Sequence, residues 1–170
     1  MSGIVGGLGS PDPSTVRRML THMRHRGPDQ EGFWASEEVV LGQNRLTTME
    51  RTPGPLPLRN EDGAVIAVVD GQIYNFRELR ARLQAHGHTF RSRGDTEVVV
   101  HLWEEHGPEL VTRLDGVFAI ALYDRRAGLF FLARDPLGIK PLYGGLQGGT
   151  LYFASELGGL LAATDQVEEF

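Results

Sequence analysis

Ser2 is the residue of this chain whose type and position could do the most chemistry. If the initiator Met1 is removed, Ser2 carries a hydroxyl and a free α-amine on one residue. A hydroxyl nucleophile paired with an N-terminal amine as its base is an established arrangement for acyl transfer. If Met1 is retained, that amine is a peptide nitrogen and cannot act as a base. Ser2 therefore predicts an amidase or acyl-transfer mechanism that depends on removal of Met1.

The chain contains no cysteine, which excludes disulfides, thiolate metal sites and thiol nucleophiles together. Of its six histidines, His86 and His88 lie at a predicted helix end, and His101 and His106 lie on or near the next helix. Without thiolates or a convergent set of carboxylates, we expect these histidines to be surface or helix-cap residues rather than metal ligands. No metal and no cofactor is expected.

Composition and charge narrow the class of partner. The chain has 170 residues, 41% hydrophobic and 23% charged, which is typical of one globular domain. Its net charge of -5 and its single lysine, Lys140, argue against nucleic acid. The longest apolar runs, 64–69 and 117–123, are far shorter than the roughly 20 residues of a membrane-spanning helix. We therefore expect a cytoplasmic protein that binds neither nucleic acid nor a membrane.

The first third of the chain predicts a buried strand, one helix and one pair of strands. Residues 3–8 read as a buried strand, and apolar residues at helical spacing from Val16 predict a helix that begins at 13–14 and ends before Gly27. Segments 31–36 and 39–43 read as paired strands. Three prolines remove three backbone donors from segment 52–57, which is therefore expected to form an extended surface loop.

The rest of the chain alternates strands with a few helices. The predicted elements are a strand at 64–69 buried on both faces, a helix from Phe76 to 86–87, a helix around 98–103 capped by Asp95 or Thr96, strands at 117–123 and 129–133, a loop at 135–141, strands near 142–143 and at 150–153, and a short helix from Glu156. This order favours an α/β sandwich with sheets inside and helices outside.

Several segments, in order along the chain, resemble the glutaminase domain of the class II glutamine amidotransferases, most closely that of the asparagine synthetase family. The matching segments are 24–29 (RHRGPD), 44–46 (NRL), Gly71 with 73–75 (IYN), 94–98 (GDTEV), 114–119 (LDGVFA), 133–143 (ARDPLGIKPLY) and 153–156 (FASE). The resemblance implies a four-layer αββα fold of the N-terminal-nucleophile hydrolase type.

The resemblance also implies an organisation. Residues 1–170 correspond to the amidotransferase domain, and the Ser-Gly-Gly-x-Asp-Ser type loop of the family's ATP-pyrophosphatase domain does not occur. We therefore expect a stand-alone domain, a split subunit or a truncated chain. Its expected partners are glutamine or a related amino acid or amide, and a separate ATP-dependent synthetase subunit.

Site residues follow from the same resemblance. Ser2 stands where the family has its cysteine nucleophile. Arg45 matches the arginine that clamps the substrate α-carboxylate, for which a bidentate guanidinium is suited, and Asp95 matches the acidic contact to the α-amine. Gly71, through its amide, and Asn75 are the remaining candidate oxyanion donors. A buried arginine and a helix-capping aspartate are also ordinary scaffold parts, so both interpretations of Arg45 and Asp95 stay open.

Two further positions depart from the family pattern. The family reads Asn-Gly-Glu-Ile-Tyr-Asn where this chain has Asp70, Gly71, Gln72 and then 73–75 (IYN). Asp70 replaces an asparagine that donates to the oxyanion, and an ionised Asp70 offers acceptors and a like charge instead. Gln72 replaces a glutamate that helps to bind the substrate amine. Loss of one oxyanion donor costs about 10²–10³ in rate.

Three functions remain open. The first is a degenerate glutaminase site that binds a partner or ligand without hydrolysing glutamine. The second is a serine N-terminal-nucleophile amidase or acyltransferase. The third is an authentic glutaminase domain that supplies ammonia and is seen here as a cysteine-to-serine variant. The charged residues Arg24, His25, Arg26 and Asp29 are expected to organise a loop rather than to catalyse.

Overall fold

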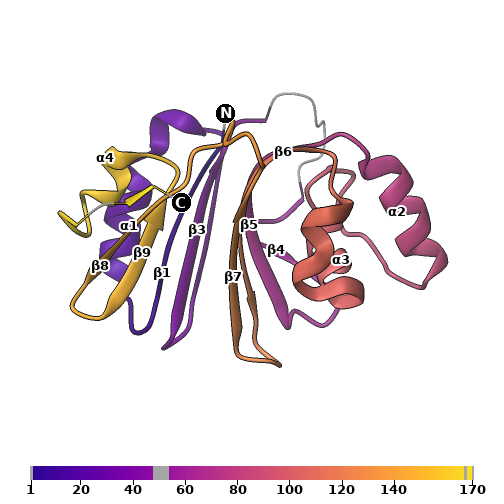
Figure 1. The fold of residues 1–170 in the computed structure, drawn as a ribbon, viewed down its shortest axis with the longest axis horizontal. Coiled ribbons are helices and arrows are strands. Elements are labelled where there is room, and N and C mark those ends of the chain that lie inside the picture. Colours follow the sequence, from indigo (N-terminus) through magenta and orange to yellow (C-terminus); the bar gives the residue numbers. More distant parts are fainter. Residues whose placement is uncertain (1, 48–53, 167, 170) are drawn as a thin grey trace.

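The protein folds into four layers, with two β-sheets face to face and helices covering the outer face of each (Figure 1). The computed structural model describes residues 2–47, 54–166 and 168–169. Helices α1 (Pro13–His22) and α4 (Leu157–Leu160) cover one sheet, and α2 (Phe76–Ala85) and α3 (Val98–His106) cover the other. The expected four-layer αββα arrangement is confirmed. In the part of the chain that the structure describes, no helix is long and apolar enough to cross a membrane.

All strand pairs in the two sheets are antiparallel. The first sheet has the order β10-β8-β9-β1-β3-β2 and the second has the order β4-β5-β6-β7. The strand bounds are β1 Gly3–Leu8, β2 Gln30–Ala35, β3 Val39–Arg45, β4 Leu58–Arg59, β5 Val65–Ile73, β6 Gly116–Asp124, β7 Leu129–Arg134, β8 Tyr143–Gln147, β9 Thr150–Ala154 and β10 Glu168–Glu169; short 3₁₀ helices occupy η1 Arg24–Arg26 and η2 Gly107–Arg113.

Alternation along β1 explains how one strand serves two cores. Ile4 faces the layer between the sheets, where it packs with residues of β5 and β6, while Val5 faces α1 and packs with Leu20. Both side chains are fully buried. Because successive strand residues point to opposite faces and both faces of β1 are covered, β1 is apolar throughout.

A side-chain amide joins the two sheets. Gln43 on β3 donates through Nε2 to the carbonyl of Val69 on β5 at 2.7 Å, and its Oε1 accepts from the Val69 N–H at 3.2 Å. Strand β4 pairs with only Ile66 and Ala67, so β5 lacks a strand partner on that side at Val69. Gln43, 2% exposed, supplies both missing hydrogen bonds and fixes β5 against β3.

Most of the elements expected from the sequence are confirmed, and the errors have physical causes. Glu97 rather than Asp95 or Thr96 occupies the N-cap of α3, and it makes no side-chain capping bond. The Asp95 carboxylate instead accepts from the Ile73 N–H at the end of β5. In the predicted surface loop, 52–53 lie outside the described residues, while Gly54 and Pro57 are buried.

The expectation of surface histidines is wrong for one of them. His101 lies on α3 and is fully buried. Its sequence neighbours Val100 and Leu102 are buried as well. His86 and His88 follow α2 as expected, and His86 is exposed. The short strands β4 and β10 were not predicted, because two residues carry no readable alternation.

We predict that Gln43→Ala lowers the free energy of unfolding by about 2–4 kcal/mol, because it leaves a buried N–H and a buried C=O of Val69 unpaired. Gln147→Ala, at an exposed position of β8, is the control and should change it by less than about 0.5 kcal/mol. Urea unfolding followed by circular dichroism measures both. Equal effects of the two substitutions would show that the amide bridge contributes nothing specific.

Candidate functional site

Ser2 lies immediately before β1, and its backbone is held by groups from two other segments. Its N–H donates to Asp70 Oδ1 on β5 at 3.3 Å, and its carbonyl accepts from Arg26 Nε of η1 at 2.8 Å. The neighbouring Gly3 pairs with Asn44, the residue before Arg45 on β3. The structure therefore brings Ser2, Asp70 and the end of β3 together.

Asp70 is buried, 1% exposed, and is shared by three donors. Its Oδ1 accepts from Lys140 Nζ at 3.2 Å as well as from Ser2, and its Oδ2 accepts from Arg26 Nη2 at 3.0 Å. Two cations thus compensate its negative charge. Both oxygens act as acceptors, so the side chain presents no N–H beside Ser2.

Lys140 and Arg26 are site residues that sequence reasoning did not assign. Lys140 follows β7 in the 135–141 loop, which Asp135 shapes by accepting from the N–H groups of Ile139 at 3.0 Å and Lys140 at 2.9 Å. Burial acts to raise the pKa of Asp135, but these backbone hydrogen bonds outweigh it and lower the pKa below its usual value. The one available signal was that Lys140 is the only lysine of the chain.

Arg45 ends β3 and is 9% exposed. Its Nη1 donates to Gln30 Oε1 on β2 at 3.3 Å and to the Gly54 carbonyl at 3.2 Å. Gln30 also donates to Gly54 at 3.3 Å, so β2, β3 and the 54–57 segment meet at this guanidinium. These contacts orient Arg45, which is the requirement for a carboxylate clamp.

Asp95 is half-buried at the end of β5, where its Oδ2 accepts from the Ile73 N–H at 2.7 Å. Burial raises the pKa of Asp95 above its usual value, and the Ile73 hydrogen bond and the nearby positive charge of Arg45 act against that rise. Arg45 and Asp95 carry the two opposite charges that recognition of an amino-acid zwitterion requires.

The remaining predicted site residues lie along and after β5. Gly71 directly follows Asp70, and a Cβ there would collide with the Val117 carbonyl of β6, which explains the glycine. Gln72 is exposed.

Asn75 lies at the start of α2. Its Nδ2 donates to the Arg113 carbonyl at 2.9 Å, and its Oδ1 accepts from the Asp115 N–H at 3.1 Å. Asn75 therefore ties α2 to the turn before β6, a contact separate from the Ser2 cluster.

The charged segment 24–29 has the loop-organising contacts that were expected. His25 Nε2 lies 2.6 Å from Glu156 Oε1, and Asp29 Oδ2 accepts from the Thr47 N–H at 2.7 Å. Arg26 alone reaches the Ser2 cluster. Its contacts with Ser2 and Asp70 give it a direct part in shaping the site.

Comparison with known protein families gives a match to the glutamine amidotransferase domain family over residues 1–170. The chain is 43% identical over 176 residues to an asparagine synthetase [glutamine-hydrolyzing] of Arabidopsis thaliana, with 100% of this chain and 30% of that protein covered. It is 41% identical to an asparagine synthetase [glutamine-hydrolyzing] of Zea mays, over 100% of this chain and 29% of the relative. The chain thus spans about a third of the curated relatives it matches.

Among solved structures, the fold resembles the glutamine phosphoribosylpyrophosphate amidotransferase of B. subtilis in complex with ADP and GMP, with a TM-score of 0.84 at 21% identity. That match covers 98% of this chain and 45% of the other. At this identity the likeness concerns the fold alone, and it agrees with the two-sheet sandwich described above.

We predict that Asp70→Asn lowers the free energy of unfolding by about 2–4 kcal/mol at neutral pH, because Arg26 and Lys140 lose the carboxylate that compensates them in a mostly buried site. Asp62→Asn is the matched control: it disrupts an ion pair with Arg126 whose side chains are 58% and 53% exposed. That change should cost less than about 1 kcal/mol. Chemical unfolding of both variants at one pH compares them, and an unaltered stability of Asp70→Asn would contradict the account.

Proposed function

Because the chain belongs to the family of glutamine amidotransferase domains, we propose that its glutaminase site is degenerate. In this proposal it binds glutamine or a related amino acid or amide without hydrolysing it. The observation that carries the proposal is that both carboxylate oxygens of Asp70 already accept hydrogen bonds. Their donors are Ser2, Arg26 and Lys140. The resemblance assigns an amide donor to this position, and the chain has a paired carboxylate instead.

Hydrolysis of an amide requires stabilisation of the oxyanion that forms in the transition state. With Asp70 acting as an acceptor, the Gly71 amide is left without its side-chain companion, and loss of one donor costs about 10²–10³ in rate. Asn75 is engaged with backbone groups before β6. A serine hydroxyl is also much less acidic than a cysteine thiol, so less of the nucleophilic anion is available. Both changes act against the same step.

Binding requires less than hydrolysis, and the groups for binding remain. Arg45 can pair with an α-carboxylate, and Asp95 can pair with an α-ammonium, each through charge-assisted hydrogen bonds. Their positions are determined by contacts with Gln30, Gly54 and Ile73 rather than by solvent-exposed rotamers. The two charges support recognition of a free amino acid whose side chain extends toward Ser2.

The partner is proposed from the relatives. Residues 1–170 form an amidotransferase-type-2-like domain, and the matched relatives named asparagine synthetase are about three times as long. We infer a cytoplasmic role beside an ATP-dependent synthetase domain, carried by a separate subunit or by a longer chain. No nucleic acid, membrane, metal or cofactor enters this proposed role.

A second candidate is a serine N-terminal-nucleophile amidase. It is favoured by the placement of the Ser2 backbone, which two hydrogen bonds hold at the start of β1. Its precondition is removal of Met1, so intact-mass measurement on native protein decides it: full retention of Met1 excludes the amidase.

We predict that the protein and its Ser2→Cys variant, both with Met1 removed, release no ammonia from glutamine above a no-protein blank. The triple variant Ser2→Cys/Asp70→Asn/Gln72→Glu should gain measurable release, because it restores the nucleophile, the oxyanion donor and the amine contact together. A coupled glutamate dehydrogenase assay follows the ammonia. Release by Ser2→Cys alone would favour an authentic glutaminase domain and refute a degenerate site.

We predict that glutamine affinity falls as the pH drops through the raised pKa of Asp95. The carboxylate form binds the α-ammonium and the protonated form does not, so weakening begins above the usual carboxylate value of about 3.9. Asp95→Asn should weaken binding about 10–100-fold near neutral pH and remove this pH dependence. Isothermal titration calorimetry measures both, and Asp115→Asn, at an exposed position, should behave as wild type. Wild-type affinity in Asp95→Asn would exclude this residue as an amine contact.

A further inference from the structure

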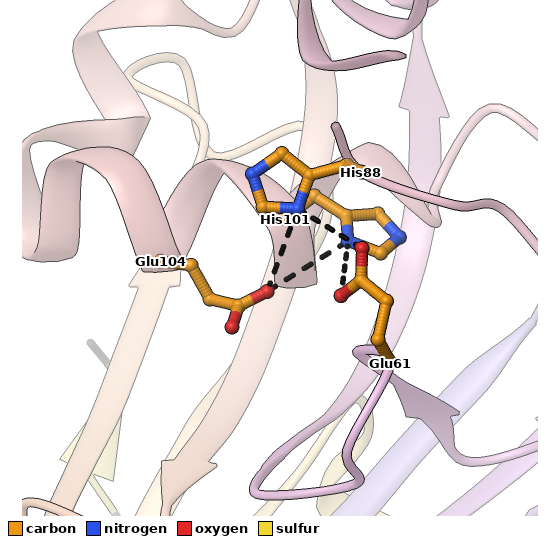
Figure 2. A group of neighbouring side chains, drawn as sticks. All are labelled: Glu61, His88, His101 and Glu104. Carbon is orange, nitrogen blue, oxygen red and sulfur yellow. Dashed lines mark hydrogen bonds and ion pairs between the residues drawn. The ribbon is translucent and has the colours of Figure 1, made fainter. Parts of the chain in front are cut away.

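Two histidines and two glutamates converge on the outer side of the second sheet, outside the Ser2 cluster (Figure 2). Glu61 lies in the turn between β4 and β5, His88 follows α2, and His101 and Glu104 lie on α3. Each offers one ligand atom, and these four atoms lie within 4.8 Å of one another. Three separate segments of the chain therefore contribute to one small polar cluster.

His101 shows that the cluster is more than a set of surface ion pairs. The residue is fully buried, and among the residues that the structure describes neither of its ring nitrogens has a hydrogen-bond partner. Its Nδ1 is directed toward the cluster, 3.3 Å from Glu61 Oε2 and 3.8 Å from Glu104 Oε2. A buried polar atom without a partner is costly, and a bound cation would use the lone pair on this nitrogen.

The distances between the histidine nitrogens and the glutamate oxygens are close to those of a tetrahedral site. His88 Nδ1 lies 3.1 Å from Glu61 Oε1 and 3.7 Å from Glu104 Oε2. With the His101 separations, the nitrogen–oxygen distances are 3.1–3.8 Å, with His88 nearest to Oε1 and His101 nearest to Oε2 of Glu61. Zinc–nitrogen and zinc–oxygen bonds of about 2.0–2.2 Å place neighbouring ligands of a tetrahedron roughly 3.4 Å apart. Small side-chain shifts would bring all four atoms onto one ion.

A carboxylate lies behind each histidine, at ion-pair distance rather than hydrogen-bond distance. His88 Nε2 lies 3.6 Å from Glu105 Oε1, and His101 Nε2 lies 3.8 Å from Glu97 Oε1. Each imidazole thus has a carboxylate near the nitrogen that faces away from the cluster. A carboxylate behind a metal-bound histidine fixes the tautomer and makes the ring a better ligand.

The glutamates are also held in place. Glu104 accepts from Asn60 at 2.8 Å and from Arg126 at 2.9 Å, both through Oε1, which leaves Oε2 toward His88 and His101. Glu61 Oε1 accepts from the Thr89 N–H at 2.9 Å. Two carboxylates would balance the charge of one divalent ion.

We propose that Glu61, His88, His101 and Glu104 form a structural binding site for one zinc ion. Two imidazole nitrogens with two carboxylate oxygens in a tetrahedral arrangement suit Zn²⁺ better than the six-to-eight oxygen sets of Mg²⁺ or Ca²⁺. All four coordination positions are protein atoms, so the ion would join the β4–β5 turn, the segment after α2, and α3. This site replaces the expectation that the histidines bind no metal.

The test is zinc titration of tag-free, chelator-treated protein against a chromophoric zinc chelator, with metal analysis after dialysis. We expect one zinc per chain and a higher thermal midpoint with zinc present. His88→Ala and Glu104→Gln should each weaken zinc binding at least about 100-fold, more than loss of a group behind a ligand costs. Both residues are partly exposed, 16% and 20%, so these variants are expected to fold. Circular dichroism checks that they do.

His25→Ala is the matched control, since it removes a histidine–glutamate pair on the other side of the molecule, with Glu156. It should bind zinc as wild type does. Cobalt substitution gives a second readout, with the intense visible absorption of a tetrahedral ion in wild type and its loss in His88→Ala. The proposal is overturned by absence of saturable 1:1 zinc binding, by wild-type zinc affinity in His88→Ala and Glu104→Gln, or by an octahedral cobalt spectrum.

Discussion

The buried carboxylate of Asp70 between two cations is the interaction on which the candidate site depends. It joins β5 to Ser2, to Arg26 of η1 and to Lys140 of the 135–141 loop, which lie up to 70 residues from Asp70 in sequence. Desolvating three charges is expensive, and the arrangement is tolerable because each charge has a partner in good geometry. The same contacts that hold Ser2 in place use the oxygens of Asp70 and leave no donor in the side chain. The presence of a carboxylate at Asp70 therefore explains both the fixed position of the Ser2 backbone and the lack of a side-chain donor beside it.

The scaffold around this cluster is that of the family, and the chain departs from the family pattern at Ser2, Asp70 and Gln72. Gln43 joins the two sheets at Val69, the residue before Asp70. The apolar side chains of β1 alternate between two cores and anchor the strand in both. Arg45 and Asp95 are each bound to the frame by backbone or amide contacts. Each residue thus has a structural role whether or not it binds a ligand, which is why a site can lose catalysis and keep its shape.

The sequence predicted the layers well because strand alternation and helical spacing are local. The resemblance assigned Ser2, Asp70 and Arg45 to one site, and the structure has the Ser2 N–H donating to Asp70; the roles of these residues stay predictions. The convergence of Arg26 and Lys140 on Asp70 could not be predicted, because it depends on tertiary packing between distant segments. Asp95 was misassigned as a helix cap because its type and position fit a cap equally well. His101 was taken for a surface residue, although its spacing from Val98 indicates the buried face of α3.

The central claim is that this site holds an amino acid while leaving its amide intact. Nuclear magnetic resonance of glutamine labelled with ¹⁵N at its side-chain amide, added to the protein with Met1 removed, tests both halves in one sample. The account predicts that the amide resonance shifts or broadens in the presence of protein and keeps its full intensity over many hours. Growth of a free ¹⁵N-ammonium signal at the expense of the amide would contradict it.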